Sequence, residues 1–163
     1  MAEIRPACAG DLETIASIYA HYVEQTYITF DLQAPSARAW KEKWKAACAA
    51  GYPWMVRERN GVVVGYATAA EFRPKPAYRS TAETTIYMDR AAVGQGLGRA
   101  LYAAELRELS QRDFHLATAG ITLPNPASVI LHEALGFTAV GVFEEVGHKL
   151  DGWRDVGWWQ LRL

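Results

Sequence analysis

Three glycines at alternating positions are the residues whose spacing most directly indicates chemistry in this sequence. They are Gly94, Gly96 and Gly98. An apolar, strand-like segment at 84–88 (TTIYM) precedes them, and a helix-forming segment follows them as far as Arg112. A strand, a glycine turn and a helix N-terminus together bind anions, because the first N–H groups of a helix lack partners within it and the helix dipole is positive there. The pattern therefore predicts a turn that can accept a phosphate group.

Several interpretations of this turn can be compared. A tight strand-to-helix connection without a ligand is the simplest of them. A P-loop requires a Lys after its last glycine, and no Lys follows these glycines. A dinucleotide-binding fold places its glycines after the first strand, whereas these lie past the middle of the chain. The pyrophosphate of an acyl-coenzyme A fits both the position of the turn and the strand before it.

The composition is that of a single domain, residues 1–163, large enough to form a hydrophobic core. Hydrophobic residues make up 50% of the chain, and 17 basic side chains stand against 18 acidic ones, for a formal net charge of −1. We therefore expect neither a nucleic-acid partner nor a membrane surface. There is no long apolar span, no signal peptide and no C-x-x-C pair, so a reduced, cytoplasmic protein is expected.

Hydrophobic periodicity and turn residues predict the elements that position the glycine turn. One amphipathic helix has Asp11 as its N-cap and extends through about Gln25, and Ser36 opens a second helix that ends near Gly51. Asn60-Gly61 is a strong hairpin signal. Strands are expected at 3–6, 53–59, 62–72, 82–88 and 115–121, a short helix at 127–135, and two final strands within 137–163 that turn at 151–152. The order implies an α/β (α+β) fold, with a mixed, mostly antiparallel sheet of about seven strands and helices on both faces.

Several segments together resemble a known family. They are AETTIYM (82–88), GQGLGRALY (94–102), LPNPASVILHEALGF (123–137) and GHKLDGWRDVGWWQ (147–160), with IRPA (4–7) and YPWMV (52–56). In this order and spacing they resemble the phosphinothricin and methionine sulfoximine N-acetyltransferase family of the GNAT superfamily. The resemblance implies the GNAT fold, acetyl-CoA as co-substrate, the α-amine of a small amino acid analogue as acceptor, direct attack in a ternary complex, and a homodimer.

Two residues are candidates for proton transfer in such a reaction. Glu83 begins an otherwise apolar strand, so it should border a buried cleft where desolvation raises its pKa toward that of a useful base. The resembled family has its catalytic glutamate at this place; a solvated edge carboxylate is the alternative. His132 lies in LHEALGF, where most of the superfamily has a tyrosine thought to protonate the thiolate and this family has histidine. It is a candidate general acid or substrate ligand, or a structural histidine.

Backbone groups are expected to contact the coenzyme. An N–H near Tyr87 or Met88 could bind the thioester carbonyl, which requires the fourth and fifth strands to separate at their ends. Val93 stands where the superfamily usually has Gln or Arg, so the phosphates depend on main-chain N–H groups of the turn. These belong to Gly94, Gln95, Gly96, Leu97, Gly98 and Arg99. The resemblance adds Asn125, which could instead cap the following helix, and Ser128. No metal is predicted, because the histidines show no ligand spacing.

The acceptor pocket is predicted from aromatic, hydroxyl and cationic residues. The segment 26–31 (TYITFD) is rich in aromatic and hydroxyl groups and includes Phe30. Arg73 and Lys75, in a proline-broken loop, could bind an acidic substrate or could be solvated charges. Tyr78 and Thr85 complete the predicted pocket. Two other functions stay open: an N-acetyltransferase of another amine, such as a polyamine or an aminoglycoside, and a non-catalytic acyl-CoA-binding regulatory module.

Overall fold

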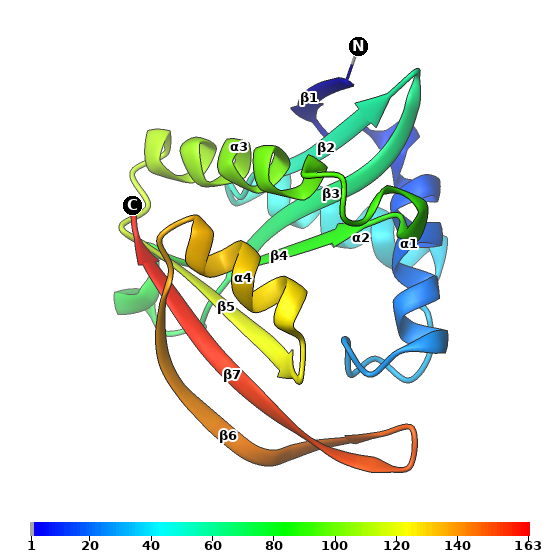
Figure 1. Cartoon of the computed structure of the whole chain (residues 1–163). Helices are drawn as coiled ribbons and strands as arrows, with labels where there is room; N and C mark the ends of the chain where they lie inside the picture. Colours follow the sequence, from blue (N-terminus) through cyan, green and yellow to red (C-terminus); the bar gives the residue numbers. More distant parts are fainter. Residues whose placement is uncertain (1) are drawn as a thin grey trace.

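The computed structural model describes residues 2–163 and contains seven strands, four α-helices and three short 3₁₀ helices (Figure 1). The strands are β1 (Ala2–Pro6), β2 (Trp54–Arg59), β3 (Val62–Glu71), β4 (Thr81–Met88), β5 (Leu116–Leu123), β6 (Thr138–Lys149) and β7 (Gly152–Arg162). The helices are α1 (Leu12–Gln25), α2 (Ala37–Ala49), α3 (Leu97–Gln111) and α4 (Pro126–Ala134). The 3₁₀ helices are η1 (Ala9–Asp11), η2 (Pro76–Tyr78) and η3 (Arg90–Ala92).

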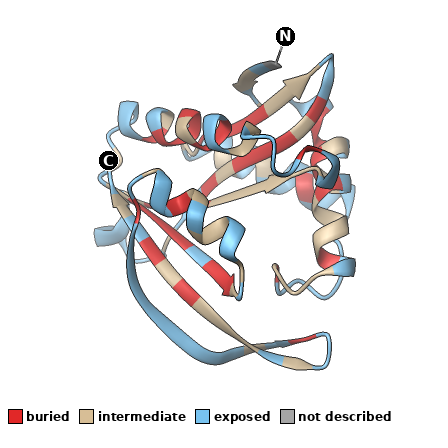
Figure 2. Cartoon of the chain, in the orientation of Figure 1, coloured by how far each residue is buried: buried red, intermediate tan, exposed pale blue. Residues whose placement is uncertain are grey.

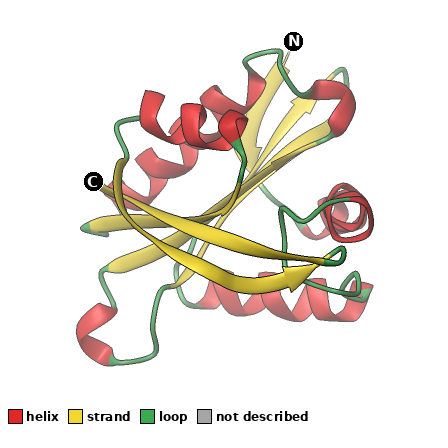
Figure 3. Ribbon diagram, turned by 60° about the horizontal axis from the view of Figure 1, so that its bottom comes forward, coloured by secondary structure: helices red, strands yellow, loops and turns green. Residues whose placement is uncertain are grey.

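All seven strands belong to one sheet with the order β1-β2-β3-β4-β5-β7-β6. Every neighbouring pair is antiparallel except β4 and β5, which run parallel. This confirms the predicted mixed, mostly antiparallel sheet with helices on both faces (Figure 3). The one parallel pair needs a long crossover connection, and the glycine turn with α3 provides it.

Buried residues lie in the strands and in the helices that cover them (Figure 2), and their side chains form separate clusters on the two faces of the sheet. On one face, α1 and α2 pack against β2 and β3 through residues that include Ile15, Trp40 and Tyr66. On the other face, α3 contributes Tyr102 and Leu109 to a cluster that reaches β5, β7 and the residues flanking α4. Burial of this kind contributes about 25 cal/mol per Å² of apolar surface, so both helical layers stabilise the sheet.

Most of the predicted turn and helix-capping residues occupy the positions expected of them. Asn60 and Gly61 both have positive φ, 54° and 78°, which is the geometry of a two-residue hairpin turn. Ser36 caps α2 by accepting the N–H of Ala39 (3.1 Å). The last turn is displaced by one residue from the prediction, because Leu150 and Asp151 are the residues with positive φ.

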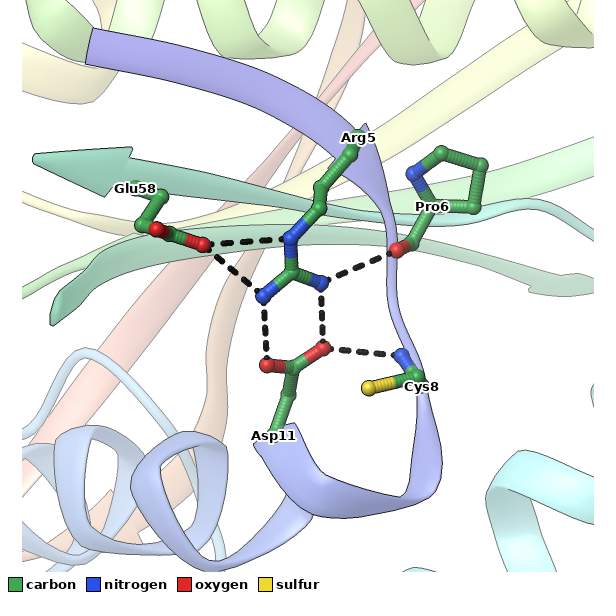
Figure 4. A network of polar contacts seen from close by, with 5 residues as sticks. All are labelled: Arg5, Pro6, Cys8, Asp11 and Glu58. Atoms are coloured by element: carbon green, nitrogen blue, oxygen red, sulfur yellow. Dashed lines mark hydrogen bonds and ion pairs between the residues drawn. The ribbon is translucent and has the colours of Figure 1, made fainter. Parts of the chain in front are cut away.

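Asp11 precedes α1 as predicted, but its carboxylate does not cap that helix. It accepts two hydrogen bonds from Arg5 (2.7 and 2.9 Å) and one from the N–H of Cys8 (2.8 Å), and Arg5 also pairs with Glu58 of β2 (Figure 4). The guanidinium beside it lowers the pKa of Asp11 to about 2. A depressed carboxyl pKa stabilises the fold above the ordinary value, and this contribution is lost as the pH falls from about 4 toward 2.

Residues 2–163 contain neither a membrane-spanning helix nor a cluster of metal-ligating side chains. No helix there combines the length and the apolar composition needed to span a membrane. In the same part of the chain, no group of three or more His, Cys, Asp or Glu side chains is arranged to hold a metal ion.

Candidate active site

The strands β4 and β5 are paired along only the first part of their length. Their pairing covers 81–83 against 116–118, although both strands continue well beyond these residues. Where the pairing ends, the Thr84 hydroxyl donates to the Thr118 carbonyl (3.0 Å) and the Thr118 hydroxyl donates to the Ala82 carbonyl (3.2 Å). The strands separate beyond these two threonines, as the sequence predicted, and we call the opening between them the fork.

One edge of β4 presents backbone N–H groups to the fork. Asp89 donates its N–H to the Val64 carbonyl (2.9 Å), which continues the ladder between β4 and β3. Because N–H groups alternate in direction along an antiparallel strand, the N–H of Tyr87 also faces β3. Those of Ile86 and Met88 face the fork. Of the two residues predicted near the thioester, Met88 thus presents its N–H to the fork, as Ile86 does, whereas the N–H of Tyr87 is directed at β3.

The glycine turn has the backbone conformation that an anion site requires. Gly94 and Gly96 have φ of 78° and 72°, and a Cβ atom added to either would meet no other atom within 4 Å. The open space lies directly before the free N–H groups of the first turn of α3. The side chain of Gln95 turns back along the chain, donating to the Ala91 carbonyl (2.8 Å) and accepting from Arg59. Gln95 thus contributes its backbone to the turn, while its side chain is engaged elsewhere.

A cleft of about 1060 Å³ joins the glycine turn to the fork. It brings together most of the residues predicted for the site. Those in its walls are Phe30, Glu83, Thr85, Tyr87, Met88, Val93, Gly94, Gly96, Leu97, Gly98, Arg99, Asn125, Ser128 and His132.

Glu83 lies on the face of the sheet that α1 and α2 cover. Side chains alternate along a strand, and Tyr87, on the same side of β4 as Glu83, contacts the rings of Tyr19 and Tyr22 in α1 (centroids 5.1 and 4.9 Å apart). Burial raises the pKa of the Glu83 carboxyl above its ordinary value, and the positive charges of Arg73 and Lys43 partly oppose that rise. In residues 2–163 no ion pair includes Glu83. The carboxylate is therefore half-buried and free to accept a proton.

Lys43 is a cleft residue that the sequence analysis missed. It lies in α2, its Nζ is 5.7 Å from the centre of the Trp40 ring, and it lines the cleft on the Glu83 side. The sequence does contain an indication of this position: Lys43 follows the buried Trp40 by three residues, and residues three apart lie on the same side of a helix. This indication is weak, because lysines alternate along 41–45 and such a pattern is typical of a solvent-exposed helix.

Three residues predicted for the acceptor pocket lie outside the cleft walls. Arg73 folds back onto Phe72, with its guanidinium 4.5 Å from the ring centre and an Nη1–H donated to the Phe72 carbonyl (2.8 Å). Tyr78 packs its ring against the edge of the same Phe72. Lys75 is exposed at the start of η2. The aromatic ring of Phe72 therefore holds this loop beside the cleft, and Arg73 acts on Glu83 only through its charge.

His132 is buried in the cleft wall, and both of its ring nitrogens have protein partners. Nδ1 lies 2.7 Å from the Ser128 carbonyl and Nε2 lies 3.1 Å from the Tyr102 hydroxyl. Burial lowers the pKa of His132 below its ordinary value, while the hydrogen bond to Ser128 acts in the opposite direction. The ring is neutral in this environment at neutral pH.

Residues around the start of α4 and the glycine turn complete the cleft beside α3. Asn125 caps α4, its Oδ1 accepting the N–H of Ser128 (3.2 Å), and it also lines the cleft. Val93 is extended and 53% exposed, so it supplies no polar group to the turn. Arg90 and Arg99 line the cleft and are the cations nearest to the turn in sequence.

The segment 26–31 forms a wall of the cleft and is held by the C-terminal hairpin, β6 and β7. Lys149 is 5% exposed and donates its Nζ hydrogen to the Thr29 carbonyl (2.8 Å). The Phe30 ring lies against Gly147, where an added Cβ would collide with the ring. The guanidinium of Arg154 stacks 4.3 Å from the centre of the Tyr27 ring. The position of this wall therefore depends on residues more than a hundred positions later in the chain.

Comparisons with known proteins agree with this geometry. Residues 4–158 match the family model of the acetyltransferase (GNAT) domain. The chain is 39% identical, over 97% of its length and 86% of the relative, to a phosphinothricin N-acetyltransferase of Streptomyces viridochromogenes. It is 37% identical, over 98% and 94%, to an L-methionine sulfoximine/L-methionine sulfone acetyltransferase of Salmonella typhimurium. A phosphinothricin acetyltransferase of Sinorhizobium meliloti, solved in complex with acetyl-CoA, superposes with a TM-score of 0.96 at 34% identity, over 99% and 88% of the two chains.

Proposed function

This chain belongs to the GNAT family of acetyl-CoA-dependent N-acetyltransferases, and we propose that its acceptor is the α-amine of a small amino acid analogue. Phosphinothricin, methionine sulfoximine and methionine sulfone are the compounds that the names of its relatives carry. The observation that carries the proposal is the fork. It joins the glycine turn, on the side of α3 and α4, to Glu83, on the side of α1 and α2.

The residues present fit an acyl-CoA. The empty space beside Gly94 and Gly96 and the free N–H groups of α3 suit a pyrophosphate. The edge of β4 offers the N–H groups of Ile86 and Met88 to an extended chain that enters the fork. A chain that enters the fork brings its end toward Glu83, so a thioester and an amine can meet there while both are bound. This supports direct attack in a ternary complex.

Each residue then has one task in the reaction. Glu83 accepts the proton of the incoming amine, directly or through a water molecule, since only the free amine is a nucleophile. The N–H of Met88 or Ile86 stabilises the negative charge that develops on the acyl oxygen; loss of one such donor costs about 3 kcal/mol in other enzymes. His132 lies on the thiolate side of the cleft and is our candidate source of the leaving group's proton.

Charge at the acceptor end favours an acidic substrate. Lys43 lines the cleft there and Arg73 lies close enough to act on Glu83. A carboxylate of an amino acid would be attracted by both cations, whereas a polyamine or an aminoglycoside would be repelled. The acceptor specificity proposed here rests on these two residues and on the wall formed by 26–31.

Thiol release from acetyl-CoA across a panel of amines tests the proposal. We expect rapid release with phosphinothricin, methionine sulfoximine or methionine sulfone, and slow release with spermidine and kanamycin. Faster turnover of the polycations would replace the proposed acceptor with another amine. Binding of acetyl-CoA without turnover of any amine would indicate a regulatory module that keeps the fold.

The glycine turn gives a prediction about coenzyme affinity. A Cβ at Gly96 would enter the space next to the first N–H groups of α3. We expect Gly96→Ala to raise KM for acetyl-CoA by about 10-fold or more, as the loss of one or two hydrogen bonds to a charged group would, with a smaller effect on kcat. Gly51→Ala is the matched control, since Gly51 also has positive φ (82°) and open space around it but lies at the end of α2. An equal rise in KM for both variants would refute a local role of the turn.

We further propose a homodimer that buries the C-terminal hairpin. Of the three tryptophans in the hairpin, Trp159 is in the core and Trp158 lines the cleft, whereas Trp153 is 63% exposed. Large exposed apolar side chains are concentrated on the same hairpin: Val140, Val142, Phe143, Val146 and Leu150. A patch of this kind on one element is typical of an interface.

Sedimentation velocity tests this proposal with two matched variants. We expect the wild-type chain to sediment as a dimer and Val142→Glu as a monomer. Val62→Glu changes an equally exposed valine in β3, outside the hairpin, and should leave the dimer intact. A monomeric wild-type chain, or a dimer that survives Val142→Glu, would exclude this interface.

A further inference from the structure

Five polar groups form a continuous hydrogen-bonded series between the cleft wall and the fork. His132 Nδ1 lies 2.7 Å from the Ser128 carbonyl, and His132 Nε2 lies 3.1 Å from the Tyr102 hydroxyl. The Tyr102 hydroxyl lies 2.6 Å from Thr84 Oγ1, which lies 3.0 Å from the Thr118 carbonyl. The sequence analysis assigned no role to Tyr102, and the reaction proposed above does not use it.

The hydrogens available to this series determine which ring nitrogen of His132 is protonated. The two ends are carbonyl oxygens, which can only accept. The Ser128 end therefore requires a hydrogen on Nδ1, and the Thr118 end takes the hydroxyl hydrogen of Thr84. Tyr102 must then donate to Thr84, which leaves its oxygen facing Nε2 as an acceptor. When the ring is neutral, no hydrogen lies between Nε2 and the Tyr102 oxygen. At 3.1 Å this contact is also longer than those of Tyr102 with Thr84 (2.6 Å) and of Thr84 with Thr118 (3.0 Å).

A second proton on the ring would complete the series without movement of any heavy atom. With hydrogens on both nitrogens, Nε2 donates to Tyr102, Tyr102 to Thr84, and Thr84 to Thr118. The three side chains are 3%, 0% and 4% exposed for His132, Tyr102 and Thr84, so bulk water does not replace a missing partner. Buried polar groups gain most from a fully satisfied network.

We infer that the Ser128 carbonyl fixes His132 as the Nδ1–H tautomer, and that Tyr102, with Thr84 behind it, is a positioning residue that makes Nε2 the atom at which the ring gains its second proton. The hydroxyl of Tyr102 is the only acceptor that the described residues offer to Nε2. The consequence for catalysis rests on the proposed function, because a histidine that must donate a proton to a thiolate has first to acquire one.

Other titratable groups near the ring are already accounted for. Glu105 follows Tyr102 one helical turn later in α3, and complete burial raises its pKa well above the ordinary value, which favours the uncharged form. Glu133, the neighbour of His132 in α4, accepts the indole N–H of Trp159 (3.2 Å). The Ser128 hydroxyl lies 3.3 Å from Nδ1, farther than the Ser128 carbonyl that accepts the Nδ1 hydrogen, and the ring also packs against the aromatic rings of Tyr102 and Phe137. The proton affinity of Nε2 thus depends mainly on the hydroxyl in front of it.

Nitrogen-15 NMR of the histidine side chains in the full chain tests this inference without substrate. We expect the neutral His132 of the wild type to carry its hydrogen on Nδ1. In Tyr102→Phe, proton binding at His132 should weaken by roughly 3- to 10-fold, the effect of one lost hydrogen bond. Thr84→Val should weaken it similarly, because Tyr102 then has no acceptor behind it and donates to Nε2. Thr84→Ser retains a hydroxyl and should restore the wild-type titration.

Tyr52→Phe is the matched control, because Tyr52 packs against the same core cluster and its hydroxyl makes no hydrogen bond within residues 2–163. Thermal unfolding of each variant establishes that it folds. An Nε2–H tautomer in the wild type, or a titration that neither Tyr102→Phe nor Thr84→Val changes, would overturn the inference. Because the measurement needs neither acetyl-CoA nor an amine, it stands even if the proposed acceptor is wrong. If the chain acetylates an amine, the limb of the pH–rate profile assigned to His132 should move with the NMR titration.

Discussion

Glu83→Gln is expected to lower kcat by about 10²- to 10⁴-fold, the usual contribution of a general base. The amide keeps the size of the side chain and removes its ability to accept the proton of the amine. Binding of acetyl-CoA, measured by calorimetry, should be unchanged, since the glycine turn is on the other face of the sheet. Unchanged turnover would exclude Glu83 as the base.

The pH dependence gives an independent signature of the same residue. A base acts when deprotonated, so kcat/KM should be high above the pKa of Glu83 and fall as the pH decreases through it. Because burial raises this pKa, the fall should occur at a higher pH than for an ordinary glutamate. The variant should lack this limb. Glu71→Gln, in an exposed position of β3 and outside the cleft walls, is the control and should retain both the rate and the limb.

Glu105→Leu is expected to stabilise the protein by about 1–3 kcal/mol at neutral pH, the usual effect of removing a buried polar group that has no partner. Glu105 is 0% exposed in the middle of α3, and neither carboxyl oxygen has a hydrogen-bond partner within residues 2–163. For a chain of this size each kcal/mol corresponds to roughly 2–4 °C in Tm. Thermal and urea unfolding would measure the gain.

The direction of the pH effect distinguishes this explanation from better packing alone. The folded-state pKa of Glu105 is raised above its unfolded value of 4.5. The wild type therefore loses stability as the pH rises above about 4.5 toward the folded-state pKa. Glu105→Leu should remove that loss, so its advantage over the wild type should grow with pH. Glu108→Leu, in the same helix but paired with Arg112 at the surface, should change stability by less than about 0.5 kcal/mol. A destabilised Glu105→Leu would contradict the prediction.

Much of the fold is predictable from the sequence because its elements end at residues with a local structural reason. Asn60-Gly61 sets a hairpin through positive φ, Ser36 caps a helix, and the glycines mark the start of α3. Asp11 is the instructive exception. A local rule assigned its carboxylate to the following helix, but an arginine and a backbone N–H nearby in space compete for it more strongly.

The candidate site is predictable where its residues form a continuous segment and much less so where distant segments meet. The glycine turn and Glu83 are indicated by the residues next to them, whereas the separation of β4 from β5 is expected from the free backbone donor that acyl transfer needs. The position of Lys43 depends on how α2 packs beside β4, and that of Arg73 depends on the ring of Phe72. The hydrophobic periodicity of α3 places Tyr102 on the buried side of the helix, where it is indistinguishable from an ordinary core residue. Only the packing of α4 against α3 brings His132 to its hydroxyl.

The fork also has a consequence for how this enzyme can diverge. In the proposed function the acyl donor is recognised by one set of residues and the acceptor by another, and the sheet lies between the two sets. Substitutions in α2 or in 26–31 can therefore change the selectivity for the amine while the affinity for the acyl donor is unchanged. Replacing these two segments by those of a relative with a different acceptor should therefore change the amine selectivity of this fold.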